Sequence, residues 1–197
     1  MQLLNSKLKR RRAGSKNLMV FVIGCLVWLG VLCGVARAEG SLSEYQVKAL
    51  CLYNFAKYVD WPAESFAEAA TPICIGVVGK DDFADALRTV VQGKAINGRV
   101  IAIQTFKPNE DASKCHILFV GALANKRLQE ILQPIKSSPV LTVGEGAAFE
   151  KAGGVIRFVI RDNKVRFDID VAAARQARLR ISSKLLGLAD AVSGKLE

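Results

Sequence analysis

Cysteine and histidine side chains are the first candidates for chemistry in this chain. The sequence has one histidine, His116, and it directly follows Cys115. A cysteine nucleophile needs its histidine base within hydrogen-bond reach. Residues 115–120 have the pattern of a strand, in which neighbouring side chains point to opposite faces. His116 cannot easily serve Cys115 there, so a structural histidine is the favoured interpretation.

Other motifs do not indicate a catalytic or metal site. The sequence has no C-x-x-C pair, no H-E-x-x-H helix and no aspartate-rich calcium loop. Residues 76–80 (GVVGK) follow a predicted strand but lack the spacing of a phosphate-binding loop and the Ser or Thr after its lysine. That turn could still present backbone amides to an anion. The pairs Asp81/Asp82 and Asp168/Asp170 fit a helix cap and a solvated strand end. We therefore expect no enzyme activity, no metal and no cofactor.

A group of arginines near the C-terminal end leaves two interpretations open. Arg175, Arg178 and Arg180 form a basic run, and Trp61 follows the first predicted helix. One interpretation is a solvated helix face and an aromatic residue that ends a helix. The other is a pocket of aromatic and guanidinium groups for a small aromatic or anionic ligand.

The N-terminal residues have the pattern of an export signal. Residues 1–17 carry six basic side chains and no acidic one, residues 18–35 are apolar, and Ala36-Arg37-Ala38 follows. This order is typical of a secretory signal peptide cleaved at an A-x-A site. The apolar run is long enough that an uncleaved signal anchor is the alternative. We expect export to the periplasm, with cleavage after Ala38.

Export changes the meaning of the net charge. The whole chain carries 28 basic and 18 acidic side chains, a formal charge of +10. Seven of the basic residues and none of the acidic ones lie in residues 1–38, so residues 39–197 carry 21 against 18. A nearly balanced exported domain gives no basic surface for nucleic acid. We expect no nucleic-acid partner.

Export also bears on the three cysteines that remain. In an oxidising compartment two of them can form a disulfide bond. Cys74 lies early in a predicted strand and Cys115 opens another, at comparable depth in elements that could be neighbours. A Cys74–Cys115 bond would close a loop of about 40 residues and stabilise the fold by roughly 4 kcal/mol. Cys51 is expected to be a free, buried side chain on the apolar stripe of the first helix.

The pattern of the first helix begins with Ser41-Leu42-Ser43-Glu44, which has the form of a capping box. The helix is expected to run to about Tyr58, where Asp60-Trp61-Pro62 ends it. Apolar side chains at a spacing of three to four residues predict its buried stripe, with Lys48 off that stripe. The predicted stripe is Val47, Leu50, Cys51, Asn54, Phe55 and Tyr58.

Short apolar runs alternate with helical patterns along the rest of the chain. Continuous apolar strands between helices predict a mostly parallel sheet that is covered on both faces. We therefore expect one compact α/β sandwich domain over residues 39–197, with a mixed sheet and a C-terminal antiparallel hairpin. The predicted strands are 73–78, 100–103, 115–120 and 140–143, with the hairpin 155–160 and 165–169. The predicted helices are 81–91, 125–135, 147–151, one from about 171, and an amphipathic one over 182–192.

Seven stretches together resemble a known family. They occur in this order: KALCLYNFAKYVDWP (48–62), ICIGVVGKDDF (73–83), GKAINGRVIAI (93–103), CHILFVG (115–121), VLTVGEGAAF (140–149), GGVIRFVIRDNKVRFDID (153–170) and ISSKLLGLADAV (181–192). The ordered set is similar to the YfiR-like family of periplasmic proteins.

The resemblance implies a regulator. The best-known member represses an inner-membrane diguanylate cyclase by binding its periplasmic sensor region and holding the cytoplasmic GGDEF domain inactive. Release of the cyclase raises cyclic di-GMP and favours biofilm formation. The resemblance also implies an α/β sandwich that forms a homodimer. The alternative is a periplasmic small-molecule sensor without a cyclase partner.

The resemblance assigns roles to particular residues. Cys74 and Cys115 match one family disulfide, whereas the second family pair would fall around residues 143–150 (VGEGAAFE), which contain no cysteine. The resemblance therefore implies one disulfide bond in this chain and not the family's second one. The partner-binding positions would be Phe149, Ile169 and Lys184. The ligand-binding positions would be Trp61 and Arg175.

Overall fold

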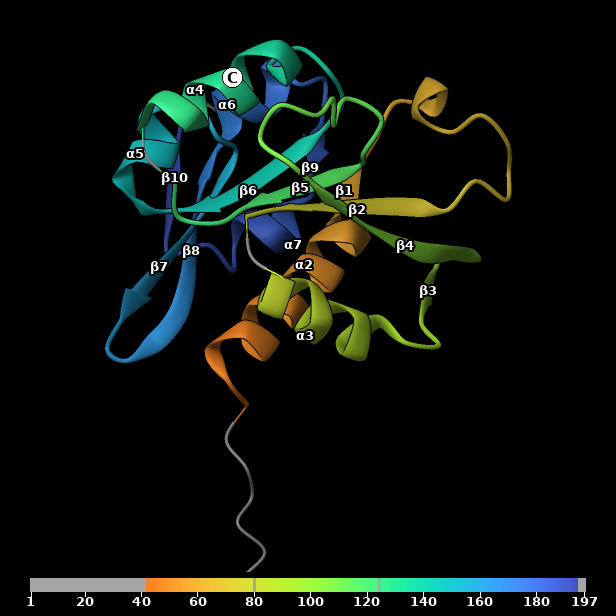
Figure 1. The fold of residues 1–197 in the computed structure, drawn as a ribbon, viewed down its shortest axis with the longest axis horizontal. Helices are drawn as coiled ribbons and strands as arrows, with labels where there is room; N and C mark the ends of the chain where they lie inside the picture. The colour runs from red at the N-terminus through yellow and green to blue at the C-terminus, as the bar shows by residue number, and fades with distance from the viewer. Residues whose placement is uncertain (1–41, 80, 124, 195–197) are drawn as a thin grey trace, which may run out of the picture. The chain divides into compact units, whose positions relative to one another are not determined.

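The computed structural model describes residues 42–79, 81–123 and 125–194, which lie in one compact unit. The predicted signal peptide lies outside these residues. Figure 1 shows helices on both sides of a central sheet. The helices are α2 (Glu44–Tyr58), η1 (Ala63–Ser65), α3 (Asp81–Val91), α4 (Asn125–Ile135), α5 (Gly146–Lys151), α6 (Val171–Gln176) and α7 (Ser183–Leu186). The strands are β1 (Val59–Asp60), β2 (Ile73–Val78), β3 (Ala95–Ile96), β4 (Arg99–Phe106), β5 (Ile117–Val120), β6 (Leu141–Glu145), β7 (Ile156–Arg161), β8 (Lys164–Asp170), β9 (Arg180–Ile181) and β10 (Ala191–Ser193).

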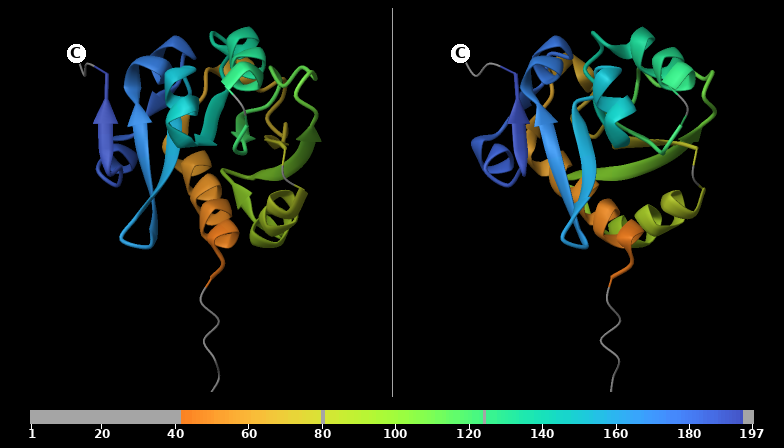
Figure 2. Two further views of the ribbon diagram at one scale, coloured as in Figure 1. Left: turned by 60° about the vertical axis from the view of Figure 1, so that its left-hand side comes forward. Right: turned by 90° about the vertical axis from the view of Figure 1, so that its left-hand side faces the viewer.

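The main sheet has eight strands in the order β10-β8-β7-β6-β5-β2-β4-β3. Five adjacent strands, β4, β2, β5, β6 and β7, are parallel, and antiparallel strands flank them. The predicted α/β class, the mostly parallel mixed sheet and the C-terminal hairpin are confirmed. The hairpin lies alongside α2 (Figure 2). A separate pair, β1 with β9, brings the C-terminal segment next to the end of α2.

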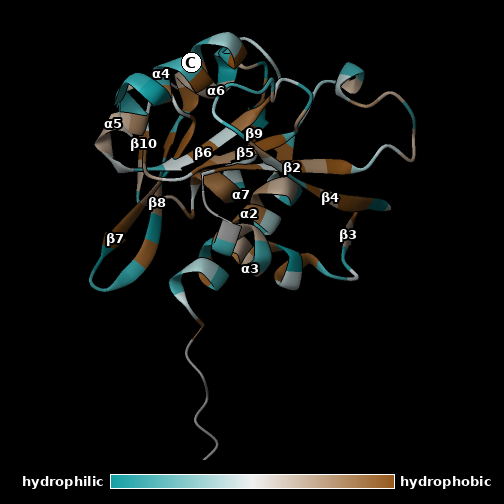
Figure 3. Cartoon of the chain, viewed as in Figure 1, coloured by the Kyte–Doolittle hydropathy of each residue, from teal (hydrophilic) through white to brown (hydrophobic). Residues whose placement is uncertain are grey.

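The central strands are apolar on both faces because each face is covered. Ile117 and Phe119 of β5 join the core cluster beneath α2 and α3. Leu118 and Val120 join a second cluster beneath α4 and α5. Figure 3 shows the hydrophobic sheet and the more polar outer helices. Successive side chains of a strand point to opposite faces, so each central strand contributes to both hydrophobic clusters, as expected for a sheet covered on both sides.

Helix α2 ends as predicted, but its cap and its buried face differ. Ser43 caps the helix, and the Gln46 side chain completes the capping box. Ser41 lies outside the described residues. The fully buried face carries Ala49, Leu52, Phe55 and Ala56 together with Lys48, whereas Leu50 is exposed. The prediction that Lys48 lies off the stripe was wrong because carboxylates pair with its ammonium inside the fold.

The predicted amphipathic helix over 182–192 was also wrong. Helix α7 ends after Leu186 at Gly187, and residues 191–193 form β10 beside β8. Backbone pairing with β8 begins at Asp190, whose N–H donates to the Phe167 carbonyl. In this segment, backbone pairing with an open sheet edge therefore outweighs the helical spacing of the apolar residues.

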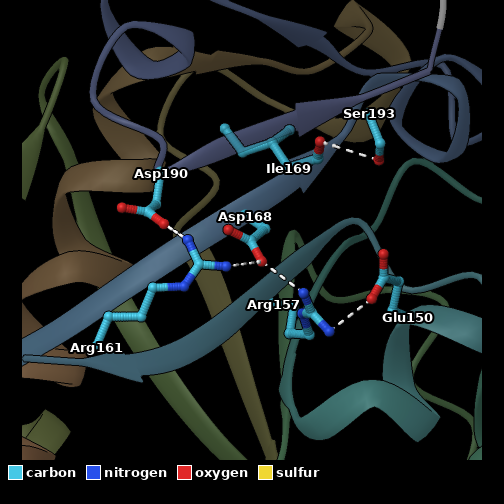
Figure 4. A network of polar contacts seen from close by, with 7 residues as sticks. All are labelled: Glu150, Arg157, Arg161, Asp168, Ile169, Asp190 and Ser193. Carbon is cyan, nitrogen blue, oxygen red and sulfur yellow. Dashed lines mark hydrogen bonds and ion pairs between the residues drawn. The ribbon is translucent and has the colours of Figure 1, made fainter.

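A polar network fastens this C-terminal edge (Figure 4). Arg157 on β7 donates to Glu150 of α5 and to Asp168 of β8, both over 2.6 Å. Arg161 pairs with Asp168 over 3.6 Å and with Asp190, just before β10. One aspartate thus joins two arginines, which links the hairpin to α5 and β10.

No helix in the described part of the chain combines the length and apolar character needed to span a membrane.

Candidate functional site: a cysteine pair beside a cavity

The sheet brings Cys74 and Cys115 together. Cys74 lies in β2, and Cys115 lies two residues before β5, its parallel neighbour. Their Sγ atoms are 3.2 Å apart as free thiols, whereas a disulfide has about 2.05 Å between its sulfurs. The sulfurs are therefore close enough to bond after oxidation with little movement. The disulfide itself stays a prediction.

The two thiols differ in acidity. A hydrogen bond from the Cys115 side chain lowers the pKa of Cys74. The same bond, followed by burial, raises the pKa of Cys115. In the reduced protein Cys74 is therefore the side chain that becomes a thiolate and a nucleophile first. Cys51 is half-buried, and burial raises its pKa to about 11, so it is less reactive than Cys74.

His116 holds the backbone around this pair. Its backbone N–H donates to the Cys74 carbonyl, and its Nδ1 accepts from the Cys74 N–H, both over 3.0 Å. Its Nε2 lies 3.1 Å from the carbonyl of Ser65, so the neutral tautomer with a proton on Nε2 fits both contacts. Burial lowers the pKa of His116, and the charge of Arg99 lowers it further. These contacts support the structural role expected for His116.

Two aromatic side chains of the segment 61–72 pack against His116. Phe66 stacks on the imidazole with ring centres 4.5 Å apart, and Trp61 meets it edge-on at 5.9 Å. The Trp61 indole N–H donates to the His116 carbonyl over 3.0 Å. On the other face of this stack, the Arg99 guanidinium lies 4.0 Å from the centre of Phe66. Arg99 also donates to two backbone carbonyls of the same segment.

A cavity of about 800 Å³ opens beside the cysteine pair. Its lining includes Cys74, Cys115, His116, Glu64 and Arg178. Arg178 donates to Glu64 over 3.1 Å, which joins the segment after β1 to the segment before β9. The remaining lining residues include Ser65, whose buried hydroxyl has no hydrogen-bond partner in the structure.

Comparison with known proteins gives the family. Residues 45–190 match the YfiR/HmsC-like family. The chain belongs to this family. Its members are periplasmic regulators of cyclic di-GMP signalling rather than enzymes, and they partner periplasmic regions of GGDEF cyclases. No curated protein gives a significant match.

One solved structure supports the α/β fold of this YfiR/HmsC-like chain, and a second is reported beside it. A conserved domain protein from Vibrio cholerae O1 biovar El Tor str. N16961 aligns with a TM-score of 0.54 and 11% identity, covering 78% of this chain and 61% of that one. An ABC domain from Streptococcus pneumonia, crystallised with L-Trp, aligns with a TM-score of 0.45 and 14% identity, covering 61% and 55%. The chain thus spans less than two thirds of either structure.

The predicted partner-binding positions of the YfiR/HmsC-like domain do not form one surface. Phe149 is 0% exposed and packs so closely on Gly144 and Gly154 that neither position has room for a side chain. Ile169 is 1% exposed in the core. A direct contact by Phe149 or Ile169 does not fit this structure because neither side chain reaches the surface. Lys184 is exposed on α7, and its role stays a prediction.

The predicted ligand positions are also separated in role. The Trp61 indole N–H is already bonded to the His116 carbonyl, and Trp61 does not line the cavity. Arg175 and Arg178 are both exposed, and of the two only Arg178 lines the cavity. Arg178 has a positive φ of 58° and lies in the turn between α6 and β9. Sequence spacing alone could not show which arginine borders the cavity.

Two structural residues were missed from the sequence. Lys48 is 4% exposed and pairs with Glu44 and, over 2.9 Å, with Glu145 at the end of β6. Burial alone would lower the pKa of Lys48, but the hydrogen bonds and charges of both glutamates outweigh it and raise the pKa. The spacing Glu44 to Lys48 was the available signal for one of the pairs. Arg99, the second missed residue, carried no motif.

Two further possibilities concern a metal ion and an anion. No group of three or more His, Cys, Asp or Glu side chains in residues 42–79, 81–123 and 125–194 could hold a metal ion. The turn at residues 76–80, which could present amides to an anion, includes position 80, which lies outside the described residues.

Proposed function

We propose that this protein is a periplasmic repressor of an inner-membrane diguanylate cyclase. The observation that carries the proposal is the match of residues 45–190 to a family of cyclic di-GMP regulators. The predicted export signal would deliver such a domain to the side of the membrane where a cyclase sensor region lies. Release of the cyclase would raise cyclic di-GMP and biofilm formation.

The repressor would act by shifting a conformational equilibrium. A protein that binds the inactive form of the sensor region more tightly than the active form favours the inactive form by that difference in affinity. A shift from mostly active to mostly inactive needs about 5.5 kcal/mol of differential binding. No catalytic step by this chain is required.

Deletion of the gene tests the proposal. Cyclic di-GMP and surface attachment are expected to rise in the deletion strain and to return when the full chain is supplied in trans. Deletion of the partner cyclase in the same strain should abolish the rise. Unchanged cyclic di-GMP after deletion contradicts the proposal.

The domain boundaries belong to the same proposal: residues 1–38 are removed and residues 39–197 form the working domain. Intact mass measurement of the protein from a periplasmic extract should give a chain that begins at Glu39. A full-length mass in the membrane fraction would instead indicate the signal anchor.

A periplasmic sensor of small molecules is the second candidate function. The cavity of about 800 Å³, with Arg178 and Glu64 on its wall, favours this alternative because it has the size of ligand pockets. An aromatic carboxylate would meet the Arg178 guanidinium. Benzoate is expected to raise the melting temperature of the purified protein, and Arg178→Ala to remove that shift, while Arg175→Ala keeps it. Equal shifts in both variants contradict binding at this cavity.

A further inference from the structure

Strand β4 lies near one edge of the main sheet and leaves most of its outer side unpaired (Figure 1). On that side β3 pairs with it only at Arg99 and Val100. Among the described residues no further strand lies beyond them. An open strand of this kind can accept an extended segment of another chain as an added strand.

The register of the sheet shows which backbone groups of β4 are free. The carbonyls of Cys74 and Val78 on β2 accept from the β5 side, so the odd-numbered residues of β2 face β4. Ile75 of β2 is aligned with Ile103 in a parallel ladder, in which the even-numbered residues of β4 point back to β2. The N–H and C=O groups of Ile103 and Thr105 therefore point to the open edge.

A groove of about 590 Å³ lies beside these groups, between the end of α3 and β4. Its apolar lining includes Val91, Ile101 and Ile103, and the two isoleucines are half-buried. Its charged lining is basic, because Arg88 and Lys94 border it and no acidic side chain of the described residues does. A segment bound here meets apolar surface and positive charge at the same place.

Lys94 shares an aromatic ring with a second lysine. Its Nζ lies 5.0 Å from the centre of the Tyr53 ring, and the Nζ of Lys57 lies 4.2 Å from the same centre. Both lysines are exposed, and neither pairs with a carboxylate in the described part of the chain. Arg88, by contrast, already pairs with Asp85 over 2.7 Å. Two like charges at one ring repel each other, so a carboxylate that approaches them is attracted to both.

We propose that β4 accepts an acidic extended segment of a partner protein as an added strand. The backbone groups of Ile103 and Thr105 exchange hydrogen bonds with this segment. An apolar side chain of the segment covers Ile101 and Ile103, and a carboxylate beside it pairs with Lys94. The edge binds a segment of this chemistry whichever protein carries it, so its occupation does not depend on the repression of a cyclase.

The charges favour such a segment over a second copy of this chain. The β4 strand of another copy, residues 99–106 (RVIAIQTF), has no acidic side chain, so it brings no partner for Lys94. Lys107 directly follows that strand and would bring a further positive charge to the groove. Like charges placed together oppose binding, whereas opposite charges favour it.

Two peptides with blocked ends test the preference for acidic charge. In extended form, one face of ETVTVTE carries its glutamates and valines, and QTVTVTQ is the neutral match. ETVTVTE is expected to shift the amide NMR signals of Ile103 and Thr105 in isotope-labelled protein purified from the periplasm. It should bind about tenfold more tightly than QTVTVTQ, and added salt should reduce the difference. No binding of ETVTVTE, or equal binding of both peptides, overturns the proposal.

Lys94→Glu and Lys126→Glu test the position of the charge. Both replace an exposed lysine by the same acid, but Lys126 lies on α4, which covers the other face of the sheet. Lys94→Glu is expected to weaken the binding of ETVTVTE about tenfold, whereas Lys126→Glu should bind it nearly as the wild type does. Circular dichroism checks that both variants are folded. Equal weakening in the two variants overturns the pairing at Lys94.

N-methylation of ETVTVTE tests the pairing of strands. In an added strand the N–H groups of alternate residues point to β4, and the others point to solvent. Methylation of the valine nitrogens and methylation of the threonine nitrogens should therefore differ, with one set losing binding and the other keeping it. Equal effects contradict an added strand. Shifts of the Ile103 and Thr105 signals that grow with protein concentration in the absence of peptide would place a second copy on this edge and also overturn the proposal.

Discussion

At the scale of single residues, His116 joins three parts of the chain. Its Nδ1 accepts from the Cys74 N–H, its Nε2–H donates to the Ser65 carbonyl, and its own carbonyl accepts from the Trp61 indole N–H. Protonation of Nδ1 would place a proton where the Cys74 N–H already donates. The folded structure therefore depends on the neutral ring, and its protonation in acid should weaken the hydrogen bonds at this site.

The expected pH dependence follows from the lowered pKa of His116. The unfolded chain has a histidine pKa of about 6.5, so it binds the proton at a higher pH than the folded chain does. The contribution is fully present above about pH 6.5 and falls as the pH drops through the lower, folded-state pKa. Urea unfolding between pH 5 and 8 should show this slope. His116→Gln should flatten it, because the chain has no other histidine. An unchanged slope in that variant contradicts the assignment.

The cysteine pair gives a second prediction at this scale. Reductant is expected to lower the free energy of unfolding of the oxidised wild-type protein by about 2–5 kcal/mol, as for other native disulfides. Cys74→Ser should remove this sensitivity, and Cys51→Ser should keep it. Denaturation with and without reductant measures the difference. A wild-type protein that is insensitive to reductant contradicts the Cys74–Cys115 bond.

At the scale of elements, α2 is held to the sheet by a buried charge. Lys48 pairs with Glu145 at the end of β6 from a position that is 4% exposed. Lys48→Met is expected to destabilise the protein by about 2–3 kcal/mol, because it removes the buried ammonium and its charge-assisted hydrogen bonds to both glutamates. Glu44→Ala, which removes the exposed carboxylate of the same group, should cost at most about 1 kcal/mol. Chemical denaturation compares them, and equal losses contradict the importance of the buried pair.

The elements also show where sequence patterns are sufficient. Strand β2 and helix α3 were predicted with their observed bounds, because a continuous apolar run and a capped periodic stretch depend on local sequence alone. Residues 182–192 have a helical pattern, yet the end of that segment pairs with β8. Short β1 and β9 carry no pattern of their own and form only because the fold brings their backbones together.

Only part of the candidate site, likewise, could be predicted from the sequence. The nearness of Cys74 and Cys115 could be predicted from their depth in two strands. The position of Arg178 at the cavity and the stack of Arg99 on Phe66 could not, because both depend on where the segment 61–72 lies in the fold. Residues that meet only through long-range packing show no regular spacing in the sequence.

At the scale of the whole molecule, a repressor fails either by losing its fold or by losing its contact surface. Phe149 is fully buried between two glycines, whereas Lys184 is exposed on α7. Phe149→Ala is expected to destabilise the domain by about 3–5 kcal/mol, and its periplasmic level should fall. Under the proposed function, cyclic di-GMP would then rise because little folded protein remains.

Lys184→Glu separates the two routes. A charge reversal on an exposed side chain should leave the unfolding free energy within about 0.5 kcal/mol of the wild type. If Lys184 contacts the cyclase sensor region, cyclic di-GMP rises at a normal periplasmic level of this protein. Immunoblots of periplasmic extracts beside cyclic di-GMP measurements give both quantities for both variants. Normal cyclic di-GMP with normally abundant Lys184→Glu removes Lys184 from the interface. A rise with Phe149→Ala at an undiminished level would instead show that the buried ring shapes the bound surface.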